Sequence, residues 1–123
     1  MYELKTITQF GAAHQLRNYK GKCENLHGHN WKIEVYVKGE ELDKDGLLVD
    51  FKDIKNKTKD IIEELDHKFL NDLEPFREIN PSSENIARFI YECLQKSLED
   101  KRIHISRVTA WESDNACATY WGD

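Results

Sequence analysis

Apolar and polar residues alternate along residues 27–38 of the chain. One set comprises His27, His29, Trp31, Ile33, Val35 and Val37, and the other comprises Asn30, Lys32, Glu34, Tyr36 and Lys38. Successive side chains of a β-strand point to opposite faces, so a period of two predicts a strand here. The two histidines are therefore expected on the same face as the tryptophan and the branched aliphatic residues.

Three further segments have strand patterns. Residues 2–14 alternate loosely, are rich in β-forming residues and end in "FGAAH". Residues 15–26 are predicted as a loop. Near the C-terminus, residues 103–112 and 116–121 flank the turn sequence "SDN", which predicts a closing hairpin.

Helical spacing occurs twice in the middle of the chain. A first helix is predicted from about Asp50, a suitable N-cap, with an inner face formed by Phe51, Ile54, Thr58, Ile61, Ile62 and Leu65. A second opens at "NPSSEN", where Ser82 or Ser83 would cap it, and has a stripe formed by Ile86, Phe89, Ile90, Cys93, Leu94 and Leu98.

The predicted order of elements is ββααββ, which indicates one α+β domain over residues 1–123. Its strands would pair antiparallel, with both helices on one face of the sheet. A four-stranded sheet has two open edges, and proteins pair, cover or charge such edges. We therefore expect subunits to associate through them.

Composition narrows the function classes. The chain has 123 residues, 39% hydrophobic and 33% charged, with a formal net charge of −5. An acidic chain without a basic stripe argues against nucleic-acid binding, and no apolar run approaches the length of a membrane span. Three cysteines and no secretory signal pattern predict a cytoplasmic protein without disulfides.

The candidate chemistry centres on "CENLHGHN", residues 23–30. His27 and His29 leave the same face of a strand and can converge on one ion. His14, at the end of the first strand, is the natural third ligand, and pairing of the two strands is expected to bring it opposite His29. Three imidazoles form a zinc site with an open fourth position. A single histidine such as His14 is, however, more often a core or surface residue.

Cys23 lies four residues before His27. A structural zinc site usually has a closely spaced cysteine pair, and the second cysteine is missing here. We interpret Cys23 as a reactive thiol beside the metal, whose thiolate form is favoured by Lys20, Lys22 and the metal charge. Such a thiolate acts as a base or a nucleophile.

Two more sites leave alternatives open. Asp66 and His67 lie where the first helical pattern stops, and they are either a proton-transfer pair or a solvated helix end. Glu112, at the end of a predicted strand, either accepts hydrogen bonds from an amino-heterocycle or is an ordinary surface carboxylate. Cys93 is expected to be inert core, Cys117 to be structural, and His104 is given no role.

With these residues in place, the sequence resembles the 6-pyruvoyl-tetrahydropterin synthase family. The resemblance runs through "FGAAH", "CENLHGHN", "LDH", "NPSSENIA" and "WES", in this order. It is closest to the bacterial 6-carboxy-5,6,7,8-tetrahydropterin synthases of queuosine biosynthesis, because the cysteine and histidines are spaced C-x3-H-G-H. The pyruvoyl enzymes of animals have two more residues in that gap.

The resemblance implies roles for particular residues. His14, His27 and His29 would bind Zn²⁺, one ion per subunit, and Cys23 would be the catalytic base. Asp66 and His67 would be the proton-transfer pair. Glu112 would anchor the pterin ring, in a pocket lined by Ser82, Ser83 and Glu84.

The resemblance also implies a fold and a reaction. The fold is the tunnelling fold, whose ββααββ subunits close into a barrel and form hexamers of two stacked trimers, with active sites between subunits. The reaction converts 7,8-dihydroneopterin triphosphate to 6-carboxytetrahydropterin, acetaldehyde and triphosphate. The alternatives are a pyruvoyl-type synthase, an enzyme that cleaves the same side chain without forming the carboxylate, and a zinc-stabilised pterin-binding protein. Arg17, Lys20 and Lys22 are candidates to bind the triphosphate on charge alone.

Overall fold

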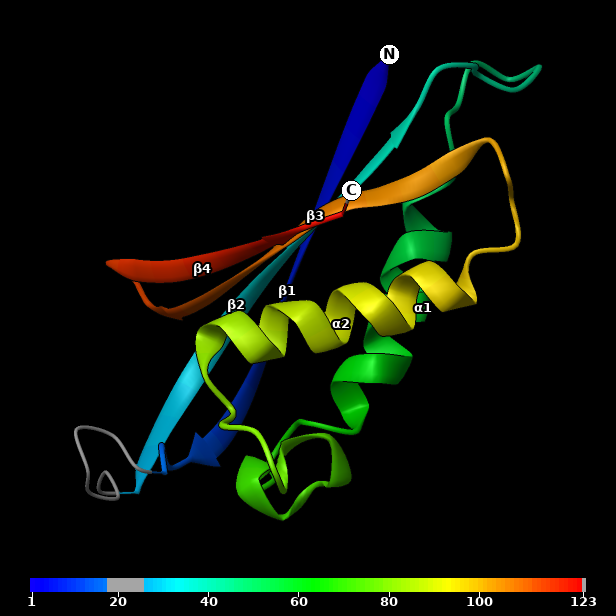
Figure 1. Cartoon of the computed structure of the whole chain (residues 1–123). Helices are drawn as coiled ribbons and strands as arrows, with labels where there is room; N and C mark the ends of the chain where they lie inside the picture. Colours follow the sequence, from blue (N-terminus) through cyan, green and yellow to red (C-terminus); the bar gives the residue numbers. More distant parts are fainter. Residues whose placement is uncertain (18–25, 123) are drawn as a thin grey trace.

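The computed structural model describes residues 1–17 and 26–122, and of His27 only the backbone. Its elements follow the predicted order (Figure 1): strands β1 (Tyr2–His14) and β2 (His27–Gly39), helices α1 (Phe51–Glu63) and α2 (Ser83–Ser97), and strands β3 (Ile103–Ser113) and β4 (Ala116–Trp121). Two 3-10 turns, η1 (Leu70–Asp72) and η2 (Glu74–Phe76), lie between the helices.

The four strands form one antiparallel sheet in the order β1-β2-β3-β4. In the β1–β2 pair, His14 lies opposite His27 and Ala12 lies opposite His29. The expectation that His14 would lie opposite His29 was therefore wrong by two residues. A shift of two keeps every side chain on its predicted face, so His14 and His29 are diagonal neighbours on one face of the sheet.

That face carries the hydrophobic core. Phe10, Trp31, Ile33, Val108 and Ala110 are buried on it, as the alternating pattern predicts. Both helices cover this face (Figure 1), α1 against β1 and α2 against β3 and β4. Among the described residues, no helix is long and apolar enough to cross a membrane.

The helix boundaries follow local chemistry. The Asp50 side chain accepts a hydrogen bond from the Lys52 N–H at the start of α1, and the Ser82 side chain accepts one from the Asn85 N–H at the start of α2. The first helix ends at Glu63, so Leu65 lies beyond it, although its side chain is still buried in the core.

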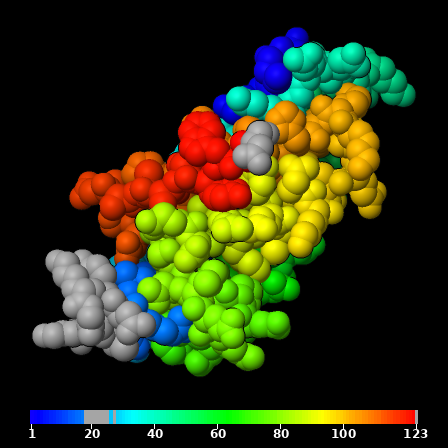
Figure 2. Space-filling view, viewed as in Figure 1, coloured from blue at the N-terminus to red at the C-terminus, as the bar shows by residue number. Residues whose placement is uncertain are grey.

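The β3–β4 hairpin packs back on α2. Tyr91 of α2 and Tyr120 of β4 meet edge to face with ring centroids 5.0 Å apart. Figure 2 shows the red atoms of β4 against the yellow-green atoms of α2 on this side of the molecule. Cys93 of α2 is only partly buried, so its assignment to the core was too strong, and Cys117 of β4 is exposed. Burial nevertheless raises the pKa of the Cys93 thiol, which makes it a poor nucleophile.

The edge of β1 is partly covered by the chain that follows α1. The His67 N–H donates to the Gly11 carbonyl at 2.6 Å, and the Ala13 N–H donates to the Lys68 carbonyl at 3.0 Å. Phe69 forms a parallel bridge with Ala13. Residues 66–69 thus run along the last third of β1, while β4 remains the outer strand at the other side of the sheet.

Candidate metal centre

Three side chains from three adjacent strands meet at one end of the sheet. They are His14 of β1, His29 of β2 and Glu112 of β3, and their ligand atoms all lie within 4.8 Å of one another. Glu112 Oε1 is 3.3 Å from His14 Nε2 and 3.0 Å from His29 Nε2. Ligands about 2.0–2.1 Å from a tetrahedral zinc ion lie roughly 3.3 Å apart, which matches these separations.

The sheet itself brings the three residues together. His14 and His29 share the helix-covered face through the β1–β2 register. Glu112 lies one residue beyond Trp111, which pairs with Lys32 of β2. An irregularity between Trp111 and Ser113 shifts the β3–β4 pairing at this point. Such irregularities redirect side chains near strand ends, and Glu112 is the residue within this one.

The hydrogen bond of His14 fixes the role of its ring. Nδ1 of His14 lies 2.8 Å from the Pro81 carbonyl, which can only accept, so Nδ1 carries the proton and donates. In a neutral ring, Nε2 then carries a lone pair. This lone pair faces a carboxylate oxygen of Glu112, and only 3% of the His14 side chain is exposed. Two lone pairs repel at this distance unless a proton or a cation lies between them. The arrangement suits a bound metal ion, with the Pro81 carbonyl orienting the ligand.

The Trp31 ring packs against both histidines of this site. It lies edge-on to the His14 ring, with centroids 5.1 Å apart, and edge-on to the His29 ring, at 5.7 Å. The two imidazoles are themselves edge to face at 5.0 Å. A fully buried indole below both rings restricts their rotation and excludes water from that side.

The other expected ligands are only partly described. The backbone of His27 lies two residues before His29 on β2 and pairs with His14, but its side chain is not described. Cys23 lies outside the described residues. Both a three-histidine set and a set of two histidines and a glutamate hold catalytic zinc in proteins, so the donor types present fit the metal.

Asp66 and His67 form a pair at the edge of β1. Nδ1 of His67 lies 3.0 Å from Oδ2 of Asp66, while Oδ1 of Asp66 accepts a hydrogen bond from the Gly11 N–H at 2.9 Å. His67 has a φ of 59°, in the left-handed region that costs a non-glycine residue about 1–3 kcal/mol and that clusters at functional sites. Asp66 and His67 are therefore in contact, with Asp66 hydrogen-bonded to the strand and the His67 side chain 87% exposed.

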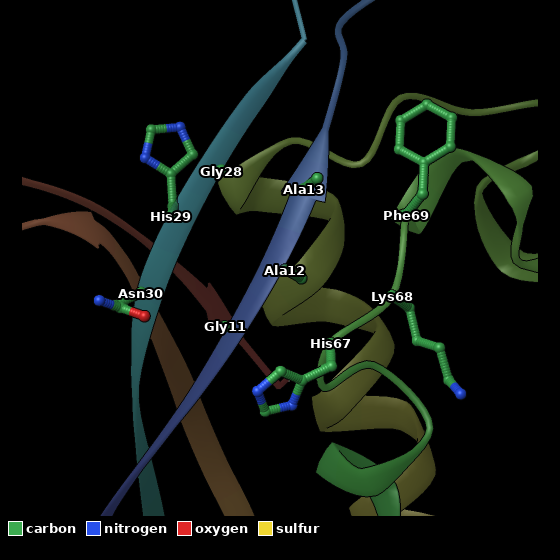
Figure 3. A pocket seen from close by; sticks show the side chains of 9 residues that line it. All are labelled: Gly11, Ala12, Ala13, Gly28, His29, Asn30, His67, Lys68 and Phe69. Atoms are coloured by element: carbon green, nitrogen blue, oxygen red, sulfur yellow. The ribbon is translucent and has the colours of Figure 1, made fainter.

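A cavity of about 580 Å³ lies along the ends of β1 and β2 and the segment that follows α1. Its lining includes His29 and Asn30 of β2, Gly11 of β1 and His67 and Phe69 beyond α1. Figure 3 shows the His29 ring beside β2 and the His67 ring beside β1, on opposite sides of the strand pair in that view. The cavity has the volume of a small-molecule site, and one residue of each group of predicted functional residues, His29 and His67, lines it.

The remaining predicted residues have structural contacts of their own. Ser82 caps α2, directly after the Pro81 carbonyl that holds His14, and Ser83 and Glu84 form the first turn of the helix. Arg17, a candidate for the triphosphate, donates to the backbone carbonyls of Asn71, Phe76 and Ile79. Lys20 and Lys22 lie outside the described residues.

Sequence reasoning missed two features of this site. It assigned Glu112 to the substrate ring without foreseeing that its carboxylate would contact His14 and His29. It also gave "NPSSEN" no part in holding His14, because a backbone carbonyl has no sequence signature. The only signal was the motif itself, whose proline lies just before the helix.

Comparison with known proteins places this geometry in a family. The family model described as 6-pyruvoyl tetrahydropterin synthase matches residues 3–123. The chain belongs to this family. A 6-carboxy-5,6,7,8-tetrahydropterin synthase of Haemophilus influenzae is 31% identical over 98% of this chain and 99% of its own length. A dihydroneopterin monophosphate aldolase of Pyrococcus furiosus is 36% identical over 85% of this chain and 84% of its own.

Solved structures agree with the fold. The 6-pyruvoyl tetrahydropterin synthase of Caenorhabditis elegans superposes with a TM-score of 0.87 at 28% identity, covering 99% of this chain and 96% of that one. The predicted α+β arrangement, with an antiparallel sheet and two helices on one face, is thereby confirmed as the fold of this family.

We expect His14→Ala to weaken zinc binding more than about 100-fold, because removal of an outer partner of a ligand alone costs about 10- to 100-fold. Competition with a chromophoric chelator measures the zinc dissociation constant. His104→Ala is the matched control, since His104 is exposed near the opposite end of β3. Equal affinity of the two variants would show that the His14 ring does not bind the metal.

Proposed function

We propose that the protein is a zinc-dependent 6-carboxy-5,6,7,8-tetrahydropterin synthase. It would convert 7,8-dihydroneopterin triphosphate, with uptake of water, to 6-carboxytetrahydropterin, acetaldehyde and triphosphate, in the pathway to queuosine. The observation that carries the proposal is the cluster of His14, His29 and Glu112, of which His29 lines the same cavity as His67, the contact partner of Asp66. The cluster would supply metal ligands, and Asp66 and His67 would supply a proton-transfer pair, in a chain of this family.

The choice of reaction rests on spacing and on relatives. The C-x3-H-G-H spacing of Cys23, His27 and His29 favours the carboxy-forming branch, and so does the name of the Haemophilus relative. The worm structure keeps the pyruvoyl-forming reaction as an alternative. The Pyrococcus aldolase keeps side-chain cleavage without carboxylate formation as another.

Each functional residue has a proposed task. A zinc ion held by the histidines would act as a Lewis acid on the hydroxyls of the substrate side chain. Cys23 would remove a proton from that side chain, and His67, oriented by Asp66, would return or relay protons. Glu112, beside both imidazoles, would hold the pterin ring with its reacting carbons close to the metal site.

Subunit association completes the proposal. The outer strand β4 is an open edge, and large apolar side chains such as Ile7 and Trp121 are about half exposed. We propose a cytoplasmic homohexamer, a dimer of trimers whose sheets join edge to edge into a barrel. The exposed His67 side chain suits an active site that a neighbouring subunit completes.

Product analysis tests the reaction. Zinc-loaded protein incubated with 7,8-dihydroneopterin triphosphate is expected to give 6-carboxytetrahydropterin and one acetaldehyde per turnover, by mass spectrometry and an aldehyde assay. Pyruvoyl-tetrahydropterin without acetaldehyde would identify the pyruvoyl branch, and an intact pterin with a shortened side chain would identify the aldolase reaction. The absence of turnover would favour the pterin-binding protein.

A Cys23 variant separates catalysis from binding. We expect Cys23→Ala to lower kcat at least about 100-fold, the usual contribution of a general base, while the zinc dissociation constant stays within about twofold. Cys117→Ala is the matched control, because that thiol is exposed on β4. Loss of zinc with loss of Cys23 would instead make the cysteine a ligand, and unchanged turnover would remove it from the mechanism.

Assembly is tested by light scattering after gel filtration. The hexamer predicts a mass near six times that of the 14.5 kDa chain. Replacement of a partly buried β4 residue by proline, such as Thr119→Pro, is expected to reduce this mass, because proline cannot donate to a strand ladder. A monomer with full turnover would overturn the shared-site model.

A further inference from the structure

The chain directly after His14 is held by two asparagine side chains. Asn71 accepts a hydrogen bond from the Gln15 N–H at 2.8 Å and donates one to the Gln15 carbonyl at 2.7 Å. Asn80 does the same for Arg17, accepting from its N–H at 2.7 Å and donating to its carbonyl at 3.0 Å. A carboxamide has one acceptor and one donor group, so each asparagine replaces the backbone of a neighbouring strand.

The Arg17 side chain continues this arrangement. Its Nη2 donates to the Phe76 carbonyl at 2.6 Å and the Asn71 carbonyl at 3.2 Å, and its Nη1 donates to the Ile79 carbonyl at 3.1 Å. The planar guanidinium presents several donors in one rigid group, which suits it to gather carbonyls from a turn. We call Gln15, Arg17, Asn71 and Asn80 the clamp.

The clamp flanks both partners of the hydrogen bond that orients His14. Gln15 follows His14 on one side, and Asn80 precedes Pro81, whose carbonyl accepts from His14 Nδ1 at 2.8 Å. The Asn80 carbonyl in turn accepts from Asn85 Nδ2 at 2.8 Å, which ties the same point to the first turn of α2. Figure 1 shows this green segment between the helices folded beside the end of β1.

These contacts give the clamp a role beyond holding a loop. The direction of His14 Nε2 depends on where the Pro81 carbonyl lies, since the ring turns to follow its Nδ1 partner. A carbonyl in a segment without regular structure is placed by the contacts of its neighbours. Asn80 and Arg17 supply such contacts, together with Asn85.

We propose that Asn80 and Arg17 are positioning residues for the metal site. They set the direction of His14 Nε2 through the Pro81 carbonyl. The inference rests on the proposed zinc site, and it adds to that site residues that touch neither metal nor substrate. Arg17 is thereby committed to backbone carbonyls and leaves the binding of the triphosphate to other groups.

The first variant is Asn80→Asp, which keeps the size of the side chain and one oxygen acceptor. It replaces the donor NH2 by an oxygen that faces the Arg17 carbonyl, so this half of the pairing becomes repulsive. We expect the zinc dissociation constant to rise about tenfold, the usual cost of losing an outer partner of a ligand. With Co²⁺ in place of zinc, the visible absorption bands are expected to shift, because they report ligand geometry.

A matched pair of arginine variants separates positioning from stability. Arg102 also gathers carbonyls, from Glu41 at 3.2 Å and Leu48 at 3.3 Å, but at the start of β3, far along the strand from Glu112. Arg17→Lys and Arg102→Lys both keep the positive charge but lose the planar set of N–H donors that the guanidinium presents. Only Arg17→Lys is expected to raise the zinc dissociation constant, several-fold, while both lower the melting temperature of the metal-free protein.

The outcomes are distinct. Wild-type zinc affinity and an unchanged Co²⁺ spectrum in both Asn80→Asp and Arg17→Lys would overturn the inference, as would an equal loss of affinity in Arg102→Lys. If Asn80→Asp does not fold, Arg17→Lys against Arg102→Lys decides alone. A wild-type protein that binds no zinc would count against the proposed function itself, before any variant is compared.

Discussion

Two side chains on neighbouring strands can hold one ion only when the strand register places them on the same face and within a diagonal step of each other. The β1–β2 pairing meets this condition for His14 and His29, and the third strand adds Glu112 to the same end of the sheet. A shift of the register by one residue would turn either histidine to the opposite face. The hydrophobic core prevents such a shift, because it would also expose Phe10 or Trp31. The packing energy of the core thus also fixes the geometry of the site.

Register sets where the ligands lie, whereas their orientation comes from outside the sheet. The Pro81 carbonyl holds the Nδ1 proton of His14, and the Trp31 ring lies below both imidazoles. The segment that supplies Pro81 has no regular structure of its own and depends on asparagine and arginine side chains for its place. The proposed metal centre would therefore rely on this short irregular segment, which carries many hydrogen bonds between side chains and backbone.

The contact between Asp66 and His67 depends on a different constraint. Asp66 is tied to the Gly11 N–H, and the backbone of residues 66–69 pairs with β1, so the strand edge holds His67 in a left-handed conformation. These backbone contacts offset the free-energy cost of the left-handed conformation. The His67 residue held in this way lines the same cavity as His29. The edge of β1, which could otherwise pair with another chain, is covered here by residues 66–69.

Much of this protein was determined by the sequence alone, because local periodicity is a property of neighbouring residues. The alternation in residues 27–38, the N-caps Asp50 and Ser82 and the hairpin around "SDN" each predicted an element that the structure contains. The motifs from "FGAAH" to "WES" pointed to the family. Tertiary structure alone decided the pairing of His14 with His27, the contact of Glu112 with two imidazoles, and the use of Arg17 and Asn80 as a clamp. The register of β1 against β2 is set by the packing of the whole sheet, and the other two features join residues more than fifty positions apart. Several of the partners are backbone carbonyls, and a carbonyl is chemically the same at every position until the fold selects one.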